Sequence, residues 1–175
     1  MNSDKRAERE QHRAWLRECI ARCRAEVARY EKAVERRPNT YRPRLAEAQH
    51  TLGKFYWWRH TPASYRTAFR LFTQALRNYD SYRGRRDLTL NRLTLMSDLQ
   101  QLSLRLDDDR AEEAYLASAA ILRELCEDPF ERCNHLRSLV RTLMLLADLC
   151  ERRGACGEAA RYRTEAEALE AERGA

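Results

Sequence analysis

Apolar residues recur every three or four positions along most of the chain, which is the spacing of one face of an α-helix. The pattern predicts an all-α protein of about seven helices, with neighbours packed antiparallel because each connection is short. Thr61 and Asp109 are predicted to cap the helices that follow them. The expected helices cover residues 4–37, 42–59, 63–79, 86–106, 109–127, 130–152 and 156–172.

The first expected helix is long and basic, and Pro38 is predicted to end it. Its apolar residues follow steps of four and three, the heptad-like spacing that lets one helix pair with another. The segment 1–14 lacks this stripe and is expected to fray. The stripe consists of Leu16, Ile20, Cys23, Val27, Tyr30 and Val34.

The expected helix at 86–106 is apolar most of the way round, which predicts burial on several sides. It lies in the middle of the series, where a stack of helices would bury it most. Its apolar residues are Leu88, Leu90, Leu93, Leu95, Met96, Leu99, Leu102, Leu104 and Leu106.

The second and third expected helices each contain half of a short motif. Leu-Gly-x2-Tyr with Gly53 and Tyr56 is followed by Ala-x3-Phe-x2-Ala with Ala68, Phe72 and Ala75. A small residue lets the two helices of a pair approach closely, and a large apolar residue fills the groove to the next pair. A single pair cannot bury its own apolar face, so this pattern predicts stacking of several pairs.

The same internal interval occurs three times along the chain. In each copy a position in one expected helix precedes an alanine of the next helix by an identical distance in sequence. A shared interval of this kind indicates an internal repeat. The three matched positions are Gly53 with Ala68, Met96 with Ala111, and Met144 with Ala159.

These motifs resemble the tetratricopeptide repeat family, in a long variant with an interval about three residues above the usual one. The segment 37–46 also resembles the linker between repeats in long arrays of high-GC bacteria. The resemblance covers roughly residues 26–170 and implies one domain, a helix-pair solenoid. It would comprise a basic half repeat (1–40), three pairs within 41–175 and a polar capping helix at the C-terminus. The pairs would be 41–80, 86–127 and 130–172, and a helical bundle without repeats is the alternative.

The resemblance also implies a concave face, which the first helix of each pair would line with a partner-binding groove. The groove is mildly basic through His50, Lys54 and Arg141, so we expect a peptide or helix with some acidic character. Either Trp57 or Trp58 is expected to be an exposed anchor, because both cannot easily face the core. The groove residues are Glu47, His50, Thr51, Lys54, Trp57, Trp58, Thr94, Ser97, Gln101, Arg141 and Asp148.

Charge and composition change this picture in two ways. Residues 1–90 have a net charge of +11 and residues 91–175 have −5, which indicates a polar partner, self-association or only a solvated surface. No apolar stretch reaches the length of a membrane span and no signal sequence is present, so we expect a cytoplasmic protein with its six cysteines reduced.

Candidate chemistry is sparse. Cys19 and Cys23 share a helix face, but a zinc site needs further converging ligands. Residues 107–109 are three aspartates at a helix start, where they favour the helix dipole rather than a metal. No catalytic motif is present, so we expect no enzyme, no cofactor and no metal.

Three functions fit the sequence. The favoured one is a non-catalytic adaptor or scaffold that binds a peptide or a helix in the groove. A nucleic-acid-associated regulator is the second, because arginine and tyrosine gather at 41–44 and 79–86, both expected to be loops. A subunit that self-assembles through the first helix is the third.

Overall fold

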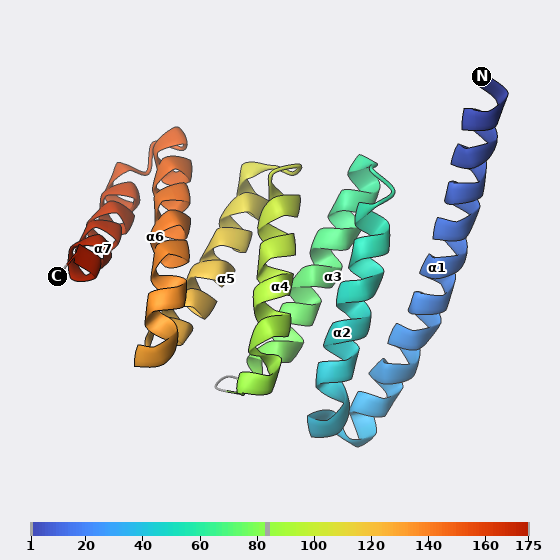
Figure 1. Cartoon of the computed structure of the whole chain (residues 1–175), viewed down its shortest axis with the longest axis horizontal. Coiled ribbons are helices and arrows are strands. Elements are labelled where there is room, and N and C mark those ends of the chain that lie inside the picture. Colours follow the sequence, from blue (N-terminus) through green and yellow to red (C-terminus); the bar gives the residue numbers. More distant parts are fainter. Residues whose placement is uncertain (1, 83–84, 175) are drawn as a thin grey trace. The chain divides into compact units, whose positions relative to one another are not determined.

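The structure is a computed structural model that describes the backbone of residues 2–82 and 85–174 (Figure 1). These residues form seven helices and no strand, which confirms the all-α fold, and each bound lies within four residues of its predicted position. The helices are α1 (Asn2–Arg36), α2 (Pro38–Trp57), α3 (Pro62–Asp80), α4 (Arg86–Ser103), α5 (Asp108–Cys126), α6 (Pro129–Arg152) and α7 (Cys156–Gly174). Arg83 and Gly84, part of the predicted break before α4, lie outside the described residues.

Local sequence signals account for the helix starts. Pro38 is the first residue of α2, where its missing N–H costs nothing, so it ends α1 and begins the next helix at once. Thr61 caps α3 as predicted. Its hydroxyl accepts from the Ser64 backbone N–H at 3.2 Å, while the Ser64 hydroxyl accepts from the Thr61 backbone N–H at 3.0 Å.

Two predictions about connections are wrong. Asp107, rather than Asp109, caps α5: its carboxylate accepts from the Arg110 backbone N–H at 3.1 Å. The first of the three aspartates is the one with extended backbone, so the helix begins directly after it. Residues 41–44 are helical: Pro43 lies in the second turn of α2, and the Asn39 carbonyl that a Pro43 N–H would have bonded accepts from the Tyr82 hydroxyl instead.

The chain divides into two compact units, residues 1–105 and 106–175, which we call the N-terminal unit and the C-terminal unit. The N-terminal unit contains α1 to α4. Each of its helices packs on the next one in sequence, and α2 also touches α4. The predicted pair 86–127 has one helix in each unit, so that pairing and the solenoid remain predictions.

The most extensive helix contact in the N-terminal unit is between α2 and α3. Ala68, Phe72 and Ala75 are completely buried there. Gly53 faces the ring of Phe72, and a Cβ added at Gly53 would lie only 2.4 Å from the Phe72 Cε1 atom. The small residue of the motif therefore has the structural role that the sequence predicted.

Helix α1 is only partly packed. Leu16, Ile20 and Val27 are buried as predicted, whereas every side chain from residue 5 to residue 15 is exposed. Figure 1 shows this end of α1 extending past the neighbouring end of α2. Residues 5–14, which were expected to fray, are helical although their side chains are exposed, and Trp15 is the first residue of α1 whose ring packs on α2.

Helix α4 is less enclosed than its composition predicts. Leu95, Leu99 and Leu102 are buried, but Leu90 and Leu104 keep 72% and 71% of their surface exposed. Both lie near the ends of the helix, Leu104 just past its last residue. Leucine content alone therefore overestimated the number of buried faces.

The C-terminal unit consists of α5, α6 and α7, with α6 packed on both of the others. Its core is aliphatic. Ion pairs join the helices: Arg123 holds Glu165 of α7 through two hydrogen bonds of 2.7 and 2.8 Å. Arg163, which replaces the aromatic residue of the motif, binds Glu151 of α6. Fully buried residues of this core include Ala114, Leu122, Leu143, Leu146 and Ala147.

Candidate functional site

The predicted groove residues of the N-terminal unit lie on α2 and α4, which pack together. Exposed hydroxyl, amide and acidic groups line this surface, and His50 and Lys54 are half-buried within it. We call it the α2–α4 face. Its exposed predicted members are Glu47, Thr51, Thr94, Ser97 and Gln101.

Asp98 of α4 is the residue that organises this face. Its Oδ2 atom lies 2.7 Å from His50 Nε2 and 3.2 Å from Lys54 Nζ. Burial alone would raise the pKa of Asp98, but the hydrogen bond from His50 and the charge of Lys54 outweigh it and lower that pKa. Asp98 therefore binds both of the basic residues that α2 contributes to the predicted groove.

Sequence reasoning missed Asp98, although a signal was present. Asp98 directly follows Ser97 and lies four residues after Thr94, so it shares the helix turn of residues that were selected. Its role appears only once α2 and α4 are known to touch. The remaining groove predictions, Arg141 and Asp148, belong to the C-terminal unit; both are exposed on α6, and Asp148 lies 3.6 Å from Arg163.

The two adjacent tryptophans have different environments. Trp57 is half-buried, with its ring 6.3 Å from that of Phe72 in the core. Trp58, the residue after the last turn of α2, keeps 45% of its surface exposed. Trp58 is therefore the exposed member of the pair.

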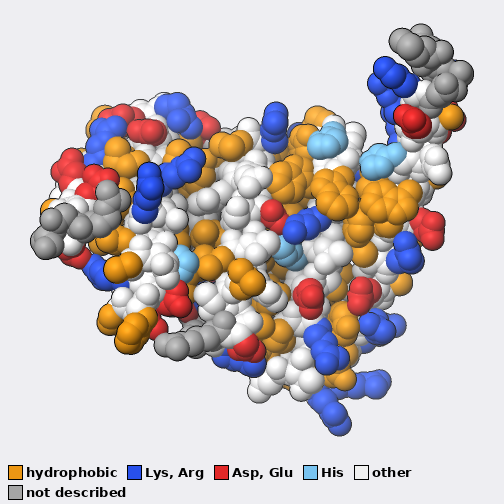
Figure 2. Space-filling model, in the orientation of Figure 1, with side chains coloured by type: hydrophobic (Ala, Val, Ile, Leu, Met, Phe, Trp, Pro, Cys, Tyr) orange, Lys and Arg blue, Asp and Glu red, His pale blue; other side chains and the backbone are white. Residues whose placement is uncertain are grey.

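Trp58 belongs to an aromatic cluster that also contains Trp15 of α1 and Phe55 of α2. The Trp15 and Trp58 rings stack with their centroids 6.4 Å apart, and Phe55 meets each of them edge-on, at 5.8 and 5.3 Å. Trp15 is 44% exposed, and His12 lies 5.6 Å from its ring. In Figure 2 hydrophobic side chains reach the surface beside histidines near the projecting end of α1.

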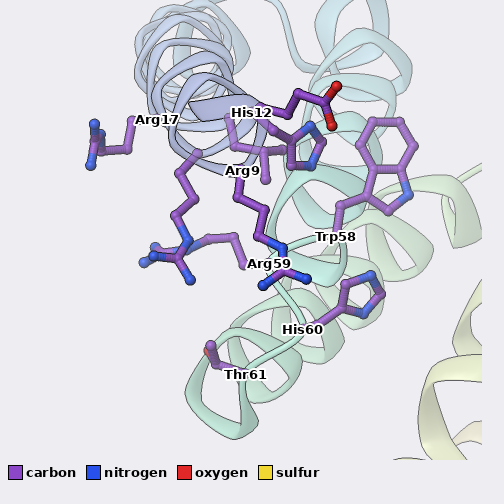
Figure 3. Close-up of a pocket in the computed structure, with 10 residues that line it drawn as sticks. Arg9, His12, Arg17, Trp58, Arg59, His60 and Thr61 are labelled. Carbon is purple, nitrogen blue, oxygen red and sulfur yellow. The ribbon is translucent and has the colours of Figure 1, made fainter. Parts of the chain in front are cut away.

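A pocket of about 840 Å³ adjoins the aromatic cluster, between α1 and the connection from α2 to α3 (Figure 3). Four arginines line it, and we call it the arginine pocket. None of the four guanidinium groups forms a hydrogen bond or ion pair with the residues that the structure describes. The lining residues are Glu8, Arg9, His12, Arg13, Leu16, Arg17, Trp58, Arg59, His60 and Thr61.

His60 lines this pocket with an unusual backbone conformation. Its φ angle is +52°, in the left-handed region that residues other than glycine rarely adopt. Such a conformation costs about 1 kcal/mol and is concentrated at functional sites. The His60 ring contacts the Tyr65 hydroxyl at 3.2 Å, which fixes its direction beside Trp58.

Neither Trp15 nor the four arginines were selected from the sequence. Trp15 precedes the apolar stripe and fell next to the segment expected to fray. The arginines at 9, 13 and 17 repeat every fourth residue, which was a detectable signal for one helix face. Arg59 could not be added to that face without knowing that the α2–α3 connection lies beside α1.

The residues that suggested nucleic-acid binding are used for packing instead. Tyr79 and Tyr82 are buried, and the Tyr82 hydroxyl donates to the Asn39 backbone carbonyl at 2.7 Å. Arg85 pairs with Asp87 at its own helix start. These two tyrosines are therefore not available to stack on bases.

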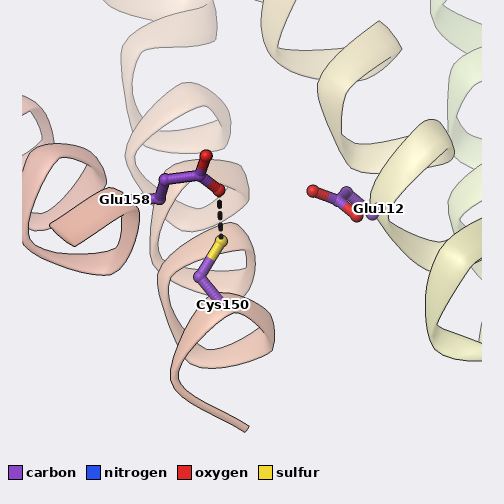
Figure 4. Close-up of side chains that lie close together, drawn as sticks. All are labelled: Glu112, Cys150 and Glu158. Carbon is purple, nitrogen blue, oxygen red and sulfur yellow. Dashed lines mark hydrogen bonds between the residues drawn. The ribbon is translucent and has the colours of Figure 1, made fainter. Parts of the chain in front are cut away.

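A second cluster lies in the C-terminal unit, where Glu112 of α5, Cys150 of α6 and Glu158 of α7 converge (Figure 4). Their possible ligand atoms all lie within 4.8 Å of one another. The buried Cys150 thiol donates to Glu158 at 3.8 Å, and Glu112 is paired with Arg153. Burial and the nearby carboxylate of Glu158 raise the pKa of Cys150, so the thiol keeps its proton.

That cluster offers a cation three donors, but metal binding requires a thiolate. One carboxylate already has an arginine partner. The Cys150–Glu158 hydrogen bond and the Glu112–Arg153 ion pair instead link the three helices of the unit. Among the cysteines described, Cys19 is buried, Cys23 is half-buried, and Cys133 and Cys156 are exposed free thiols.

No helix within the described residues has both the length and the apolar character needed to cross a membrane. Comparison of the chain with known protein families, with curated proteins and with solved structures finds no match in any of the three. Function must therefore be argued from the two sites of the N-terminal unit, the aromatic cluster with its pocket and the α2–α4 face.

Proposed function

We propose that this chain is a non-catalytic protein-interaction adaptor whose N-terminal unit binds a peptide or a helix. The observation that carries the proposal is the aromatic cluster. Two tryptophans lie in contact with each other, both nearly half exposed, at the edge of a pocket. Tryptophan is the residue that most often dominates the binding energy of protein interfaces.

The cluster could contribute substantial binding energy. A tryptophan side chain offers up to about 250 Å² of surface, so Trp15 and Trp58 each leave roughly 100 Å² in contact with water. Burying that area at about 25 cal/mol per Å² corresponds to about 2.5 kcal/mol for each ring. Phe55 contacts both rings edge-on, so they are already ordered before a partner binds.

The α2–α4 face supports the same proposal through hydrogen bonding. Thr51, Thr94, Ser97 and Gln101 are exposed on two packed helices and offer donors and acceptors to a ligand. Asp98 pairs with Lys54 and His50 on this face, so the basic charge that would attract an acidic ligand lies in the arginine pocket instead. We therefore place the anchor of the partner at the aromatic cluster and its polar contacts on either side.

The tetratricopeptide-like repeat remains part of this proposal. The Gly53–Phe72 contact and the buried Ala68 and Ala75 agree with the roles that the motif assigns to those positions. We place the protein in the cytoplasm because its cysteines are free thiols. Self-assembly through α1 and binding of nucleic acid are the competing proposals.

A peptide-display screen tests the function. The screen would use the full chain as bait, and each enriched peptide would be measured by fluorescence anisotropy against Trp15→Ala and Trp58→Ala. Each substitution should weaken binding by about tenfold or more, as expected for loss of an anchor. Phe130→Ala is the matched control, because Phe130 is 87% exposed on α6 of the C-terminal unit. Peptides that bind both tryptophan variants as well as wild type would refute the proposal.

A further inference from the structure

We propose that the ligand of the arginine pocket is an acidic α-helix of a partner protein that lies along α1. Its carboxylates would pair with Arg9, Arg13 and Arg17, and an apolar side chain would enter the pocket beside Trp58. This inference rests on the proposed function and names the partner's chemistry. Three observations about the pocket carry it: its charge, its spacing and its floor.

The pocket has an excess of positive charge, with four arginines and one glutamate, Glu8, in its lining. Arg9, Arg13, Arg17 and Arg59 have no acidic partner among the described residues, whereas other arginines of α1 do. Arg6 pairs with Glu10, Arg22 with Glu18, and Arg29 with Glu26. Residues 1–105 carry 23 basic and 11 acidic side chains, a net charge of +12, and four of these arginines line this one pocket.

The arrangement is also unfavourable for α1 in isolation. Like charges four residues apart on a helix destabilise it, and Arg9, Arg13 and Arg17 form two such pairs in succession. The side chains of residues 5–14 are all exposed, so no burial of these side chains offsets that repulsion. An anionic partner along this face would remove the repulsion and stabilise the exposed segment at the same time.

The spacing favours a helical partner. Side chains four residues apart lie about 6 Å apart along a helix axis. A second helix with carboxylates at positions i, i+4 and i+8 repeats the same spacing, so it can meet all three arginines without bending. Arginine also forms bidentate bonds with carboxylates, which fixes such a pairing in register.

The floor of the pocket is apolar. Leu16 and Trp58 line it together with the arginines, and a volume of about 840 Å³ admits more than one side chain. A partner helix that carries apolar residues on its acidic face would bury them here. The amphipathic helix-in-groove mode combines such apolar anchors with flanking ion pairs.

A peptide fits this site better than a single-stranded nucleic acid. Trp15 and Trp58 stack on each other, so their facing sides are not open to a base. Glu8 also lines the pocket. A peptide can place a lysine or arginine beside Glu8, whereas a nucleic-acid backbone offers only phosphates at that position.

The test compares three fluorescent probes by anisotropy with the full chain. The first is a stapled helical peptide with glutamates at i, i+4 and i+8 and leucines at i+3 and i+7. The second has the same composition with its glutamates distributed around the helix, and the third is an oligouridine. The triple variant R9Q/R13Q/R17Q is compared with R22Q/R29Q/R36Q, which removes three other exposed arginines from the same helix. Circular dichroism verifies that both variants fold.

We expect the first peptide to bind most tightly and R9Q/R13Q/R17Q to weaken it about tenfold, because each exposed ion pair contributes a factor of roughly two. The control triple variant should change its affinity less than twofold. Equal binding of the two peptides, tighter binding of oligouridine, or no effect of R9Q/R13Q/R17Q would overturn the inference. Peptides from the display screen that still require Trp58 would leave the proposed function intact in each of those cases.

Discussion

Replacing Gly53 with alanine should destabilise the N-terminal unit, although alanine is the better helix former. The added Cβ would lie 2.4 Å from Cε1 and 2.6 Å from Cδ1 of Phe72, far inside van der Waals contact. The Phe72 ring is completely buried and cannot turn into free space. Relieving this steric overlap therefore requires α2 and α3 to move apart where Gly53 faces Phe72.

The expected magnitude follows from two opposed effects. Inserting a methyl group into a well-packed core costs typically about 1–3 kcal/mol. The exchange of glycine for alanine within a helix returns about 1 kcal/mol. The net change in the free energy of unfolding should be a loss of about 1 kcal/mol, and more if the backbone cannot move.

Urea unfolding followed by tryptophan fluorescence measures this change. Trp15, Trp57 and Trp58 all lie in residues 1–105, so the signal reports on the N-terminal unit alone. If the free energy of unfolding falls by about 2 kcal/mol per molar urea, the urea midpoint of the variant should be lower by about 0.5 M. Gly157→Ala in α7 is the control, because nothing lies within 4 Å of its added Cβ. Its stability, measured by circular dichroism during urea unfolding, should be unchanged or slightly raised.

A double-mutant cycle separates the contact from other effects. Phe72→Leu removes the ring atoms that the new Cβ would strike, so Gly53→Ala should cost less in that background than in wild type. A Gly53→Ala protein with a raised midpoint would refute the reasoning. It would show that the close approach of α2 and α3 is not what requires glycine at this position.

Three further predictions concern the site. Asp98→Asn should lower the free energy of unfolding at pH 7 by about 1–2 kcal/mol; because the pKa of Asp98 is lowered, this stabilisation is present above about pH 4 and is lost as the pH falls through the lowered pKa. The urea midpoints of variant and wild type should therefore converge in acid, and a difference that stays constant with pH would contradict the role of the Asp98 charge. Trp57→Ala should destabilise the unit by about 2–3 kcal/mol and Trp58→Ala by less than about 1 kcal/mol, and equal losses in urea unfolding would count against their different burial. His60→Gly should raise the thermal midpoint, since glycine adopts a positive φ at no cost, and a lowered midpoint would show that the His60 ring outweighs its backbone strain.

The sequence predicted the helices well because their signals are local. Pro38, Thr61 and Pro62 mark helix ends through their own backbone and side-chain chemistry, so no knowledge of the fold was needed. The misplaced cap at Asp109 shows the limit of such signals. Three adjacent aspartates have the same capping chemistry, and only the path of the backbone chooses Asp107 among them.

The candidate site was predicted less well because it depends on contacts between helices. His50 and Lys54 were found by counting positions on α2, but their shared partner Asp98 lies on a different helix. Trp58 was considered together with Trp57, and only the contact of Trp57 with Phe72 separates the two. Helix periodicity assigns residues to a face, and it does not state which face of another helix lies opposite.

The basic charge of the first half of the chain shows why this difference matters for function. Net charge counts every arginine equally, and the repeat resemblance led us to expect a basic groove at His50, Lys54 and Arg141. Pairing distinguishes among them: Lys54 is bound to Asp98, whereas Arg9, Arg13, Arg17 and Arg59 have no such partner among the described residues. An unpaired cation can attract a ligand without first giving up an ion pair, so it contributes its full interaction to binding. For that reason the site of an acidic partner is expected beside α1 and the exposed tryptophans, one helix before the face that the repeat resemblance selects.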